Sequence, residues 1–161
     1  MFEEQQLDPT RHNRKAFRSG VPALDRFLQQ QAHQNMRRGV SQTLVLVPAE
    51  APDQIAGFYT LAPAEVRLAD LQPADAKPLP PYPVPCFRLG RLARDERWQG
   101  QGIGALLLGL AVQRCLDAKR SIGGYALIVD AKDAAAEEFY ERHGFLHFQD
   151  TPRSLYLPLG G

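Results

Sequence analysis

A glycine-rich turn between a predicted strand and a predicted helix constrains this 161-residue chain more than any other feature of its sequence. The strand is predicted over residues 86–93, and glycines alternate at positions 100, 102 and 104. Apolar residues then recur at helical spacing from position 102 to 116. A helix that starts at such a turn presents unpaired backbone N–H groups, and its dipole favours negative charge. The sequence therefore predicts an anion site formed by the main chain.

Two common nucleotide motifs do not fit this turn. A P-loop needs Lys and then Ser or Thr after its last glycine, but Ala105 and Leu106 follow Gly104. A dinucleotide fingerprint needs Gly-x-Gly-x-x-Gly and an acidic residue that closes a second strand about 20 positions later, and this chain has neither. The run Gln99-Gly-Gln-Gly-Ile-Gly104 instead resembles the pyrophosphate-binding motif of the GCN5-related N-acetyltransferase (GNAT) superfamily.

A second segment, residues 129–145, resembles the strand–helix–strand ending of the same superfamily. Its helix is predicted over residues 133–142, with Asp133 as the N-cap and Gly144 as the stop. Asp133 stands where the superfamily usually has Asn, and a carboxylate can cap a helix but cannot donate a hydrogen bond to a cofactor. The resemblance implies the GNAT acyl-CoA N-acyltransferase fold, an α/β architecture with a mixed, mostly antiparallel sheet flanked by helices.

The remaining segments predict further helices and strands around this centre. With 161 residues, 44% of them hydrophobic, the chain suits one domain over residues 1–161. One amphipathic helix is predicted from Pro22 to about Arg37, and five prolines within residues 77–85 predict a stiff, extended connector. The other expected elements are a short strand or arm before residue 19, a hairpin of strands 43–47 and 55–61, a weak strand or short helix over 66–71, and strands 125–129, 145–148 and 154–157.

Charge and composition exclude several classes of protein. Lys and Arg number 19 against 18 Asp and Glu, so a net charge of +1 gives no bulk attraction to nucleic acid or to an acidic membrane. No stretch of about 18 apolar residues occurs, and the two cysteines are too few for a disulfide framework. His143 and His147 do not share a helix face as metal ligands would. We therefore expect a cytoplasmic protein without a metal or a membrane span.

The resemblance narrows further to the acetyltransferase toxins of toxin–antitoxin systems, over about residues 7–158. The segments that carry it, besides the two motifs, are residues 22–28, 57–61, 79–85 and 89–93. The resemblance implies transfer of acetyl from acetyl-CoA to the α-amino group of aminoacyl-tRNA, which blocks translation. It also implies a ribbon-helix-helix antitoxin as partner and a homodimer.

Site residues follow from the same resemblance. Tyr140, at the end of the last helix, is the expected catalytic acid, because superfamily members place a tyrosine hydroxyl beside the cofactor sulfur. A phenol with a pKa of about 10 can protonate a thiolate of similar basicity. The expected acetyl-CoA contacts are Leu92, Ala93, Arg94, Arg97, Gln99, Gly100, Gln101, Gly102, Ile103 and Gly104, and the candidates for contacts with RNA phosphates are Arg91, Arg37, Arg38, Arg14 and Lys15.

Other interpretations stay open at this point. The chain fits a housekeeping acetyltransferase of a small amine, peptide or protein, which the near-neutral charge favours, or an inactive acyl-CoA-binding module. Intact Gln99, Gly102, Gly104 and Tyr140 argue against the inactive module. Tyr140 also fits a core tyrosine bonded to a backbone carbonyl, and the arginines fit ordinary ion pairs and helix caps.

Overall fold

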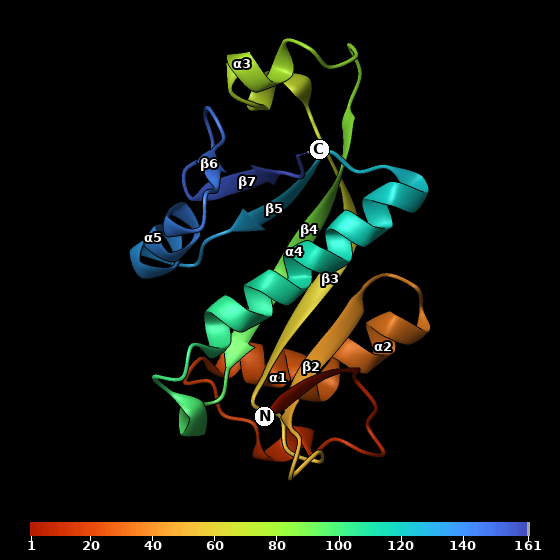
Figure 1. The fold of residues 1–161 in the computed structure, drawn as a ribbon, viewed down its shortest axis with the longest axis vertical. Helices are drawn as coiled ribbons and strands as arrows, with labels where there is room; N and C mark the ends of the chain where they lie inside the picture. The colour runs from red at the N-terminus through yellow and green to blue at the C-terminus, as the bar shows by residue number, and fades with distance from the viewer. Residues whose placement is uncertain (161) are drawn as a thin grey trace. The chain divides into compact units, whose positions relative to one another are not determined.

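The computed structural model describes residues 1–160, and its strands form one seven-stranded sheet (Figure 1). The order is β1-β2-β3-β4-β5-β7-β6. β4 and β5 run parallel, whereas the pairs β1–β2, β2–β3, β5–β7 and β6–β7 are antiparallel. The predicted mixed, mostly antiparallel sheet is therefore confirmed. The strands are β1 (Phe2–Gln6), β2 (Gln42–Pro48), β3 (Gly57–Val66), β4 (Val84–Arg94), β5 (Ala126–Asp130), β6 (Leu146–His147) and β7 (Ser154–Pro158).

The described residues group into two compact units. The first contains residues 1–62 and 90–111, and the second contains residues 63–89 and those from 112 onward. In the first unit the predicted hairpin is present, with Thr43 opposite Thr60 and Leu44 opposite Tyr59. β3 continues past the predicted end of the second strand, as far as Val66.

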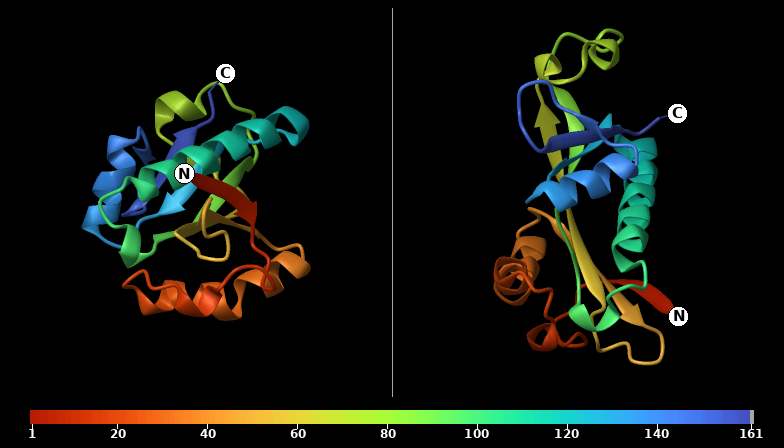
Figure 2. Two further views of the ribbon diagram at one scale, coloured as in Figure 1. Left: turned by 60° about the horizontal axis from the view of Figure 1, so that its bottom comes forward. Right: turned by 90° about the vertical axis from the view of Figure 1, so that its left-hand side faces the viewer.

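Helices cover both faces of the hairpin in the first unit (Figure 2). Successive residues of a strand point to opposite faces. On one face Phe58 packs against Phe17 and Phe27, with ring centroids 5.4 and 6.4 Å apart. On the other face Gly57 lies under the start of α4 (Ile103–Ile122). A Cβ at Gly57 would lie 2.8 Å from Leu107 and 3.0 Å from Ile103, so only glycine allows this close approach.

The predicted helix from Pro22 to Arg37 is wrong in one respect, because the structure divides it into two. α1 spans Pro22–Gln30 and α2 spans Ala32–Arg37. Gln31 has φ −124° and ψ −32°, outside the helical region. The break lets Phe27 and Leu28 on α1 and the fully buried Ala32 on α2 share one core. No proline or glycine marks this break, so only long-range packing explains it.

The second unit has its own core around strands β5, β6 and β7. Tyr156 on β7 is fully buried, its hydroxyl donates to Asp75 at 2.5 Å, and it accepts from the backbone N–H of Gln72 at 2.9 Å. These bonds join β7 to α3 (Pro73–Ala76), while the short helix η2 (Leu68–Asp70) replaces the weak element predicted over residues 66–71. The core residues are Val66, Leu71, Val84, Cys86, Ala126, Ile128, Phe148 and Tyr156.

Two predicted boundaries need correction. α4 continues to Ile122, six residues past the predicted end, and stops before Gly123, whose φ is +84°. The proline-rich connector is shorter than predicted, because β4 already begins at Val84 and includes Pro85. The carbonyl of Pro85 accepts from the N–H of Tyr125, a bond that needs no donor from proline. No helix in residues 1–160 combines the length and the apolarity needed to cross a membrane.

Candidate functional site

The loop between β4 and α4 has the geometry of an anion site. Gly100 and Gly102 have φ of +79° and +72°, which L side chains rarely adopt, and open space surrounds the position of a Cβ at each. The first helical bond runs from the N–H of Leu106 to the carbonyl of Gly102 at 3.0 Å. The N–H groups at the start of α4 therefore lack intrahelical acceptors and are available to an anion.

The structure refines the roles open to the predicted donor contacts. Ile103 is 1% exposed and packs toward Gly57, so only its backbone N–H is available to a ligand. Ala93 is likewise buried, in the core of the first unit. Gly104 lies within α4 rather than in the turn, so it does not supply the conformational freedom expected of it. Leu92 and Arg94 lie at the C-terminal end of β4. Gln99, Gly100 and Gln101 are exposed in the loop.

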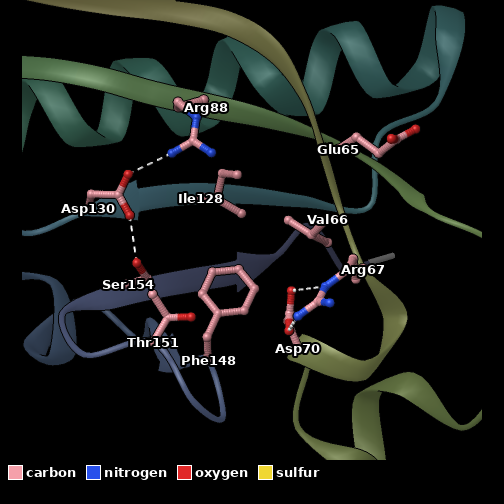
Figure 3. Close-up of a pocket in the computed structure, with 10 residues that line it drawn as sticks. All are labelled: Glu65, Val66, Arg67, Asp70, Arg88, Ile128, Asp130, Phe148, Thr151 and Ser154. Atoms are coloured by element: carbon pink, nitrogen blue, oxygen red, sulfur yellow. Dashed lines mark hydrogen bonds and ion pairs between the residues drawn. The ribbon is translucent and has the colours of Figure 1, made fainter.

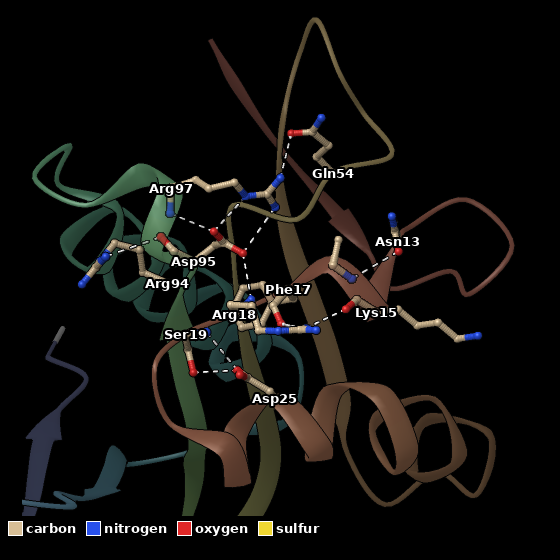
Figure 4. A network of polar contacts seen from close by, with 11 residues as sticks. Asn13, Lys15, Phe17, Arg18, Ser19, Asp25, Gln54, Arg94, Asp95 and Arg97 are labelled. Atoms are coloured by element: carbon tan, nitrogen blue, oxygen red, sulfur yellow. Dashed lines mark hydrogen bonds and ion pairs between the residues drawn. The ribbon is translucent and has the colours of Figure 1, made fainter.

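Arg97 belongs to η3 (Glu96–Trp98), the short helix that opens this loop. Its guanidinium lies over the ring of Trp98, 4.7 Å from the centroid, and donates to Asp95 through Nε at 2.9 Å. Figure 4 shows the same side chain reaching Gln54. Sequence reasoning found Arg97 but missed Asp95, because no local pattern marks a carboxylate that becomes buried only on folding.

Tyr140 is held on α5 (Ala134–Arg142) by a well-capped helix. Asp133 caps the helix as predicted, accepting from the N–H of Ala136 at 2.8 Å. The ring of Tyr140 packs against Phe139 and Phe145, with centroids 5.2 Å away in both cases. Burial raises the pKa of Tyr140 to about 12. The hydroxyl therefore stays protonated at neutral pH.

No hydrogen-bond partner for the Tyr140 hydroxyl is found within residues 1–160. The alternative interpretation, a core tyrosine whose hydroxyl donates to a backbone carbonyl, is therefore not supported, because the described part of the chain contains no such bond. The hydrogen-bonding capacity of this hydroxyl therefore stays available for a ligand.

The five candidate RNA-binding cations all lie in the first unit. Arg14 and Lys15 form η1 (Arg14–Ala16), and Arg14 donates to the carbonyl of Gln29 at 3.0 Å. Arg91 lies 3.8 Å from the ring centroid of Phe27 on α1. Within the described residues none of the five forms an ion pair. Arg37 ends α2 and Arg38 caps it.

A cavity of about 210 Å³ lies in the second unit (Figure 3). Three neighbouring strands contribute a polar chain in which Arg88 donates to Asp130 at 2.7 Å and Ser154 donates to the same carboxylate at 2.6 Å. Val66, Ile128 and Phe148 add an apolar lining. Sequence reasoning assigned no site residue here, because the lining is drawn from positions 65 to 154 without a motif.

Comparisons with known proteins connect these features to a family. Residues 8–145 match the acetyltransferase (GNAT) family. A tRNA-acetylating toxin of Mycobacterium tuberculosis is 38% identical over 142 residues, which cover 88% of this chain and 83% of the relative. The chain therefore belongs to the GNAT acetyltransferase family.

Solved structures of GNAT toxins agree with this assignment. A tyrosine-to-phenylalanine mutant of KacT superposes with a TM-score of 0.92 at 26% identity, covering 98% of this chain and 95% of that one. AtaT complexed with acetyl-methionyl-tRNA has a TM-score of 0.91 at 27% identity with the same coverage. A probable toxin TacT of Sinorhizobium fredii is 27% identical over 95% of this chain and 88% of the relative. The predicted GNAT fold is confirmed.

As a GNAT member the chain is an N-acetyltransferase that uses acetyl-CoA as the acyl donor. The residues present fit the pyrophosphate of that donor, because the space beside Gly100 and Gly102 is open and the N-terminus of α4 supplies N–H groups. The main-chain N–H groups of residues 101–104 would hold the diphosphate. Within residues 1–160 no cluster of three His, Cys, Asp or Glu side chains has the arrangement of a metal site.

Proposed function

We propose that this chain is a toxin that transfers acetyl from acetyl-CoA to the α-amino group of aminoacyl-tRNA, with Tyr140 as the general acid. The observation that carries the proposal is the relative named as a tRNA-acetylating toxin, 38% identical over 88% of this chain. A shared fold alone does not give a function, but this similarity covers both segments that carry the chemistry.

The donor supplies an acetyl thioester: the amine nitrogen bonds to the carbonyl carbon, the carbon–sulfur bond breaks, and the sulfur takes up a proton. Tyr140 provides that proton from its hydroxyl. A pKa of about 12 keeps this hydroxyl protonated over the whole physiological range, as a proton donor must be. The amine loses its own proton to water, since no residue is assigned as a general base.

Local cations provide the attraction to RNA that a net charge of +1 does not. Arg91, Arg14 and Lys15 lie on or against the α1 side of the first unit, and Arg37 and Arg38 end α2. Cations that form no ion pair retain their full charge for phosphates. We assign these five side chains to the RNA backbone, which makes binding dependent on salt.

The same proposal includes a partner and a cellular location. AtaT has been solved bound to the C-terminus of its antitoxin AtaR, and a KacTA–DNA complex is also known. We propose that a small ribbon-helix-helix antitoxin neutralises this chain in the cytoplasm, where acetyl-CoA and charged tRNA are both present. A homodimer and a single domain over residues 1–161 stay predictions.

Transfer of labelled acetyl tests the proposal directly. The purified protein is incubated with radiolabelled acetyl-CoA and a pool of aminoacyl-tRNA, and label is counted in precipitated RNA. Deacylated tRNA is the matched control, because it offers the same phosphates without an α-amino group. We expect label in charged tRNA only, and growth arrest when the chain is expressed without an antitoxin.

Two outcomes would contradict the proposal. Label in peptides or small amines but not in charged tRNA would indicate the housekeeping acetyltransferase. Binding of acetyl-CoA without transfer to any acceptor would indicate the inactive module. In either case growth would be normal without an antitoxin.

A further inference from the structure

A buried carboxylate stands directly before the donor loop. Asp95 follows β4 and is 1% exposed, although its partner Arg97 is 45% exposed. It is the N-cap of η3, the first element of the loop. A carboxylate buried in this way loses its hydration and stays ionised only when several donors surround it. Its contacts therefore indicate which segments it holds together.

Both oxygens of Asp95 accept hydrogen bonds from two segments (Figure 4). Oδ1 accepts from the backbone N–H and the Nε of Arg97, both at 2.9 Å. Oδ2 accepts from the backbone N–H of Arg18 at 2.9 Å and from Nη2 of Arg97 at 3.3 Å. Burial opposes ionisation, but the hydrogen bonds from Arg97 and Arg18 outweigh it and keep the pKa of Asp95 below its ordinary value.

Backbone bonds join the same segments a second time. The N–H of Glu96 donates to the carbonyl of Arg18 at 2.8 Å, and the N–H of Asp95 donates to the carbonyl of Ala56 at 2.9 Å. The start of the loop is thereby fixed from two directions. Gly100 and Gly102, five and seven positions after Asp95, adopt positive φ without a contact at the position of a Cβ. The glycines supply the turn but do not hold it in place.

We propose that Asp95 is a positioning residue for acetyl-CoA binding: its carboxylate fixes the start of the donor loop and the direction of the Arg97 guanidinium. The loop amides then meet the pyrophosphate already arranged, and binding loses less conformational entropy. Asp95 contacts neither the donor nor the acceptor. The inference rests on the proposed role of the loop in binding the donor.

The test measures binding of CoA itself, by calorimetry, to the wild type and to Asp95→Asn. The matched control is Asp117→Asn, because Asp117 lies exposed on α4 in an ion pair with Arg120. We expect the Kd for CoA to rise about tenfold or more in Asp95→Asn, as the loss of a charged hydrogen-bond acceptor predicts, and not in Asp117→Asn. The rate at saturating acetyl-CoA should stay close to that of the wild type.

Amide exchange without CoA provides a second readout. Residues 96–104 should exchange faster in Asp95→Asn, while exchange in Asp117→Asn should match the wild type. If Asp95→Asn does not fold, Asp95→Ser replaces it, because serine keeps an N-cap acceptor for Arg97 N–H but cannot bind the guanidinium as an ion. The same rise in Kd and in exchange is expected.

Each contrary result identifies which part of the reasoning is wrong. A wild type that does not bind CoA would refute the donor loop. A wild type that binds CoA, together with a folded Asp95 variant of unchanged affinity and unchanged exchange, would refute positioning by Asp95. Lower thermal stability alone, with affinity unchanged, would also overturn the proposal, because the carboxylate would then only stabilise the fold.

Discussion

Replacing Tyr140 with phenylalanine separates catalysis from folding. The substitution removes one hydroxyl for which residues 1–160 offer no hydrogen-bond partner, and it leaves the aromatic contacts with Phe139 and Phe145. Stability should therefore change by less than about 1 kcal/mol. Loss of a general acid should lower kcat by about 10²- to 10⁴-fold, with little effect on acetyl-CoA affinity.

The expected pH dependence of stability follows from the same burial. Tyr140 has a pKa of about 12 in the folded chain, against about 10 when unfolded. The unfolded chain loses its proton first, so stability is fully present below pH 10 and is lost as the pH rises through 12. The total is about 3 kcal/mol, of which about half is gone at pH 11. Tyr140→Phe lacks this loss and should gain that amount relative to wild type.

Tyr156→Phe is the matched control for the same chemical change. Tyr156 is also buried, but its hydroxyl donates to Asp75 and accepts from Gln72. We expect a loss of about 1.5–3 kcal/mol in the free energy of unfolding with kcat unchanged. The assays are denaturant unfolding from about pH 7 to 11 and single-turnover acetyl transfer. If Tyr140→Phe kept the kcat of the wild type, Tyr140 would not be the general acid. If the wild type and Tyr140→Phe lost the same stability at alkaline pH, the pKa of Tyr140 would not be raised.

Three further predictions concern packing, RNA binding and acid stability. Gly57→Ala should lower the free energy of unfolding by about 1–3 kcal/mol, because the added Cβ clashes with α4. Gly109→Ala, which has open space at the Cβ, should be neutral or stabilising by up to about 1 kcal/mol in the same thermal unfolding assay. Equal effects of the two substitutions would contradict the packing argument. Arg91→Gln should reduce the slope of log Kobs for tRNA binding against log salt concentration by about one. Arg120→Gln should leave the slope unchanged, because Arg120 is already in an ion pair. An unchanged slope for Arg91→Gln in a filter-binding titration would show that Arg91 does not contact the RNA. Burial, and after it the charge of a neighbouring arginine, lowers the pKa of His12, so the unfolded chain binds a proton first and stability falls as the pH drops below about 6.5. His12→Gln should reduce this loss of stability at acid pH, measured by urea unfolding. An unchanged loss would show that His12 does not cause it.

Features that depend on neighbours along the chain were predictable from the sequence. Asp133 caps α5 as expected, because an N-cap contact spans three residues. The turn at Gly100 and Gly102 is where alternate glycines placed it, because positive φ is a local property. The hairpin of β2 and β3 was predictable too, because its two strands are neighbours along the chain.

Other features were beyond sequence reasoning because they depend on residues far apart in the chain. The break at Gln31 has no proline or glycine to announce it, and it serves a core shared by α1 and α2. α4 extends past its predicted end to Ile122, and Lys119 in its last turn donates to the carbonyl of Leu159, 40 positions away. The cavity beside Arg88 and Asp130 has no motif, since four strands contribute to it. The assignments of residues to catalysis, acetyl-CoA binding and RNA binding stay predictions.

The sequence by itself determined the family and the location of the donor loop, because those depend on residue types at fixed short spacing. The tertiary structure decided which groups in and beside that loop are free to act. Ile103 turns inward onto Gly57, Asp95 holds the guanidinium of Arg97, and the hydroxyl of Tyr140 has no hydrogen-bond partner in the described chain. The physical reason is that burial and hydrogen bonding depend on distance in space, and Asp95 and Arg18 meet across 77 positions of sequence.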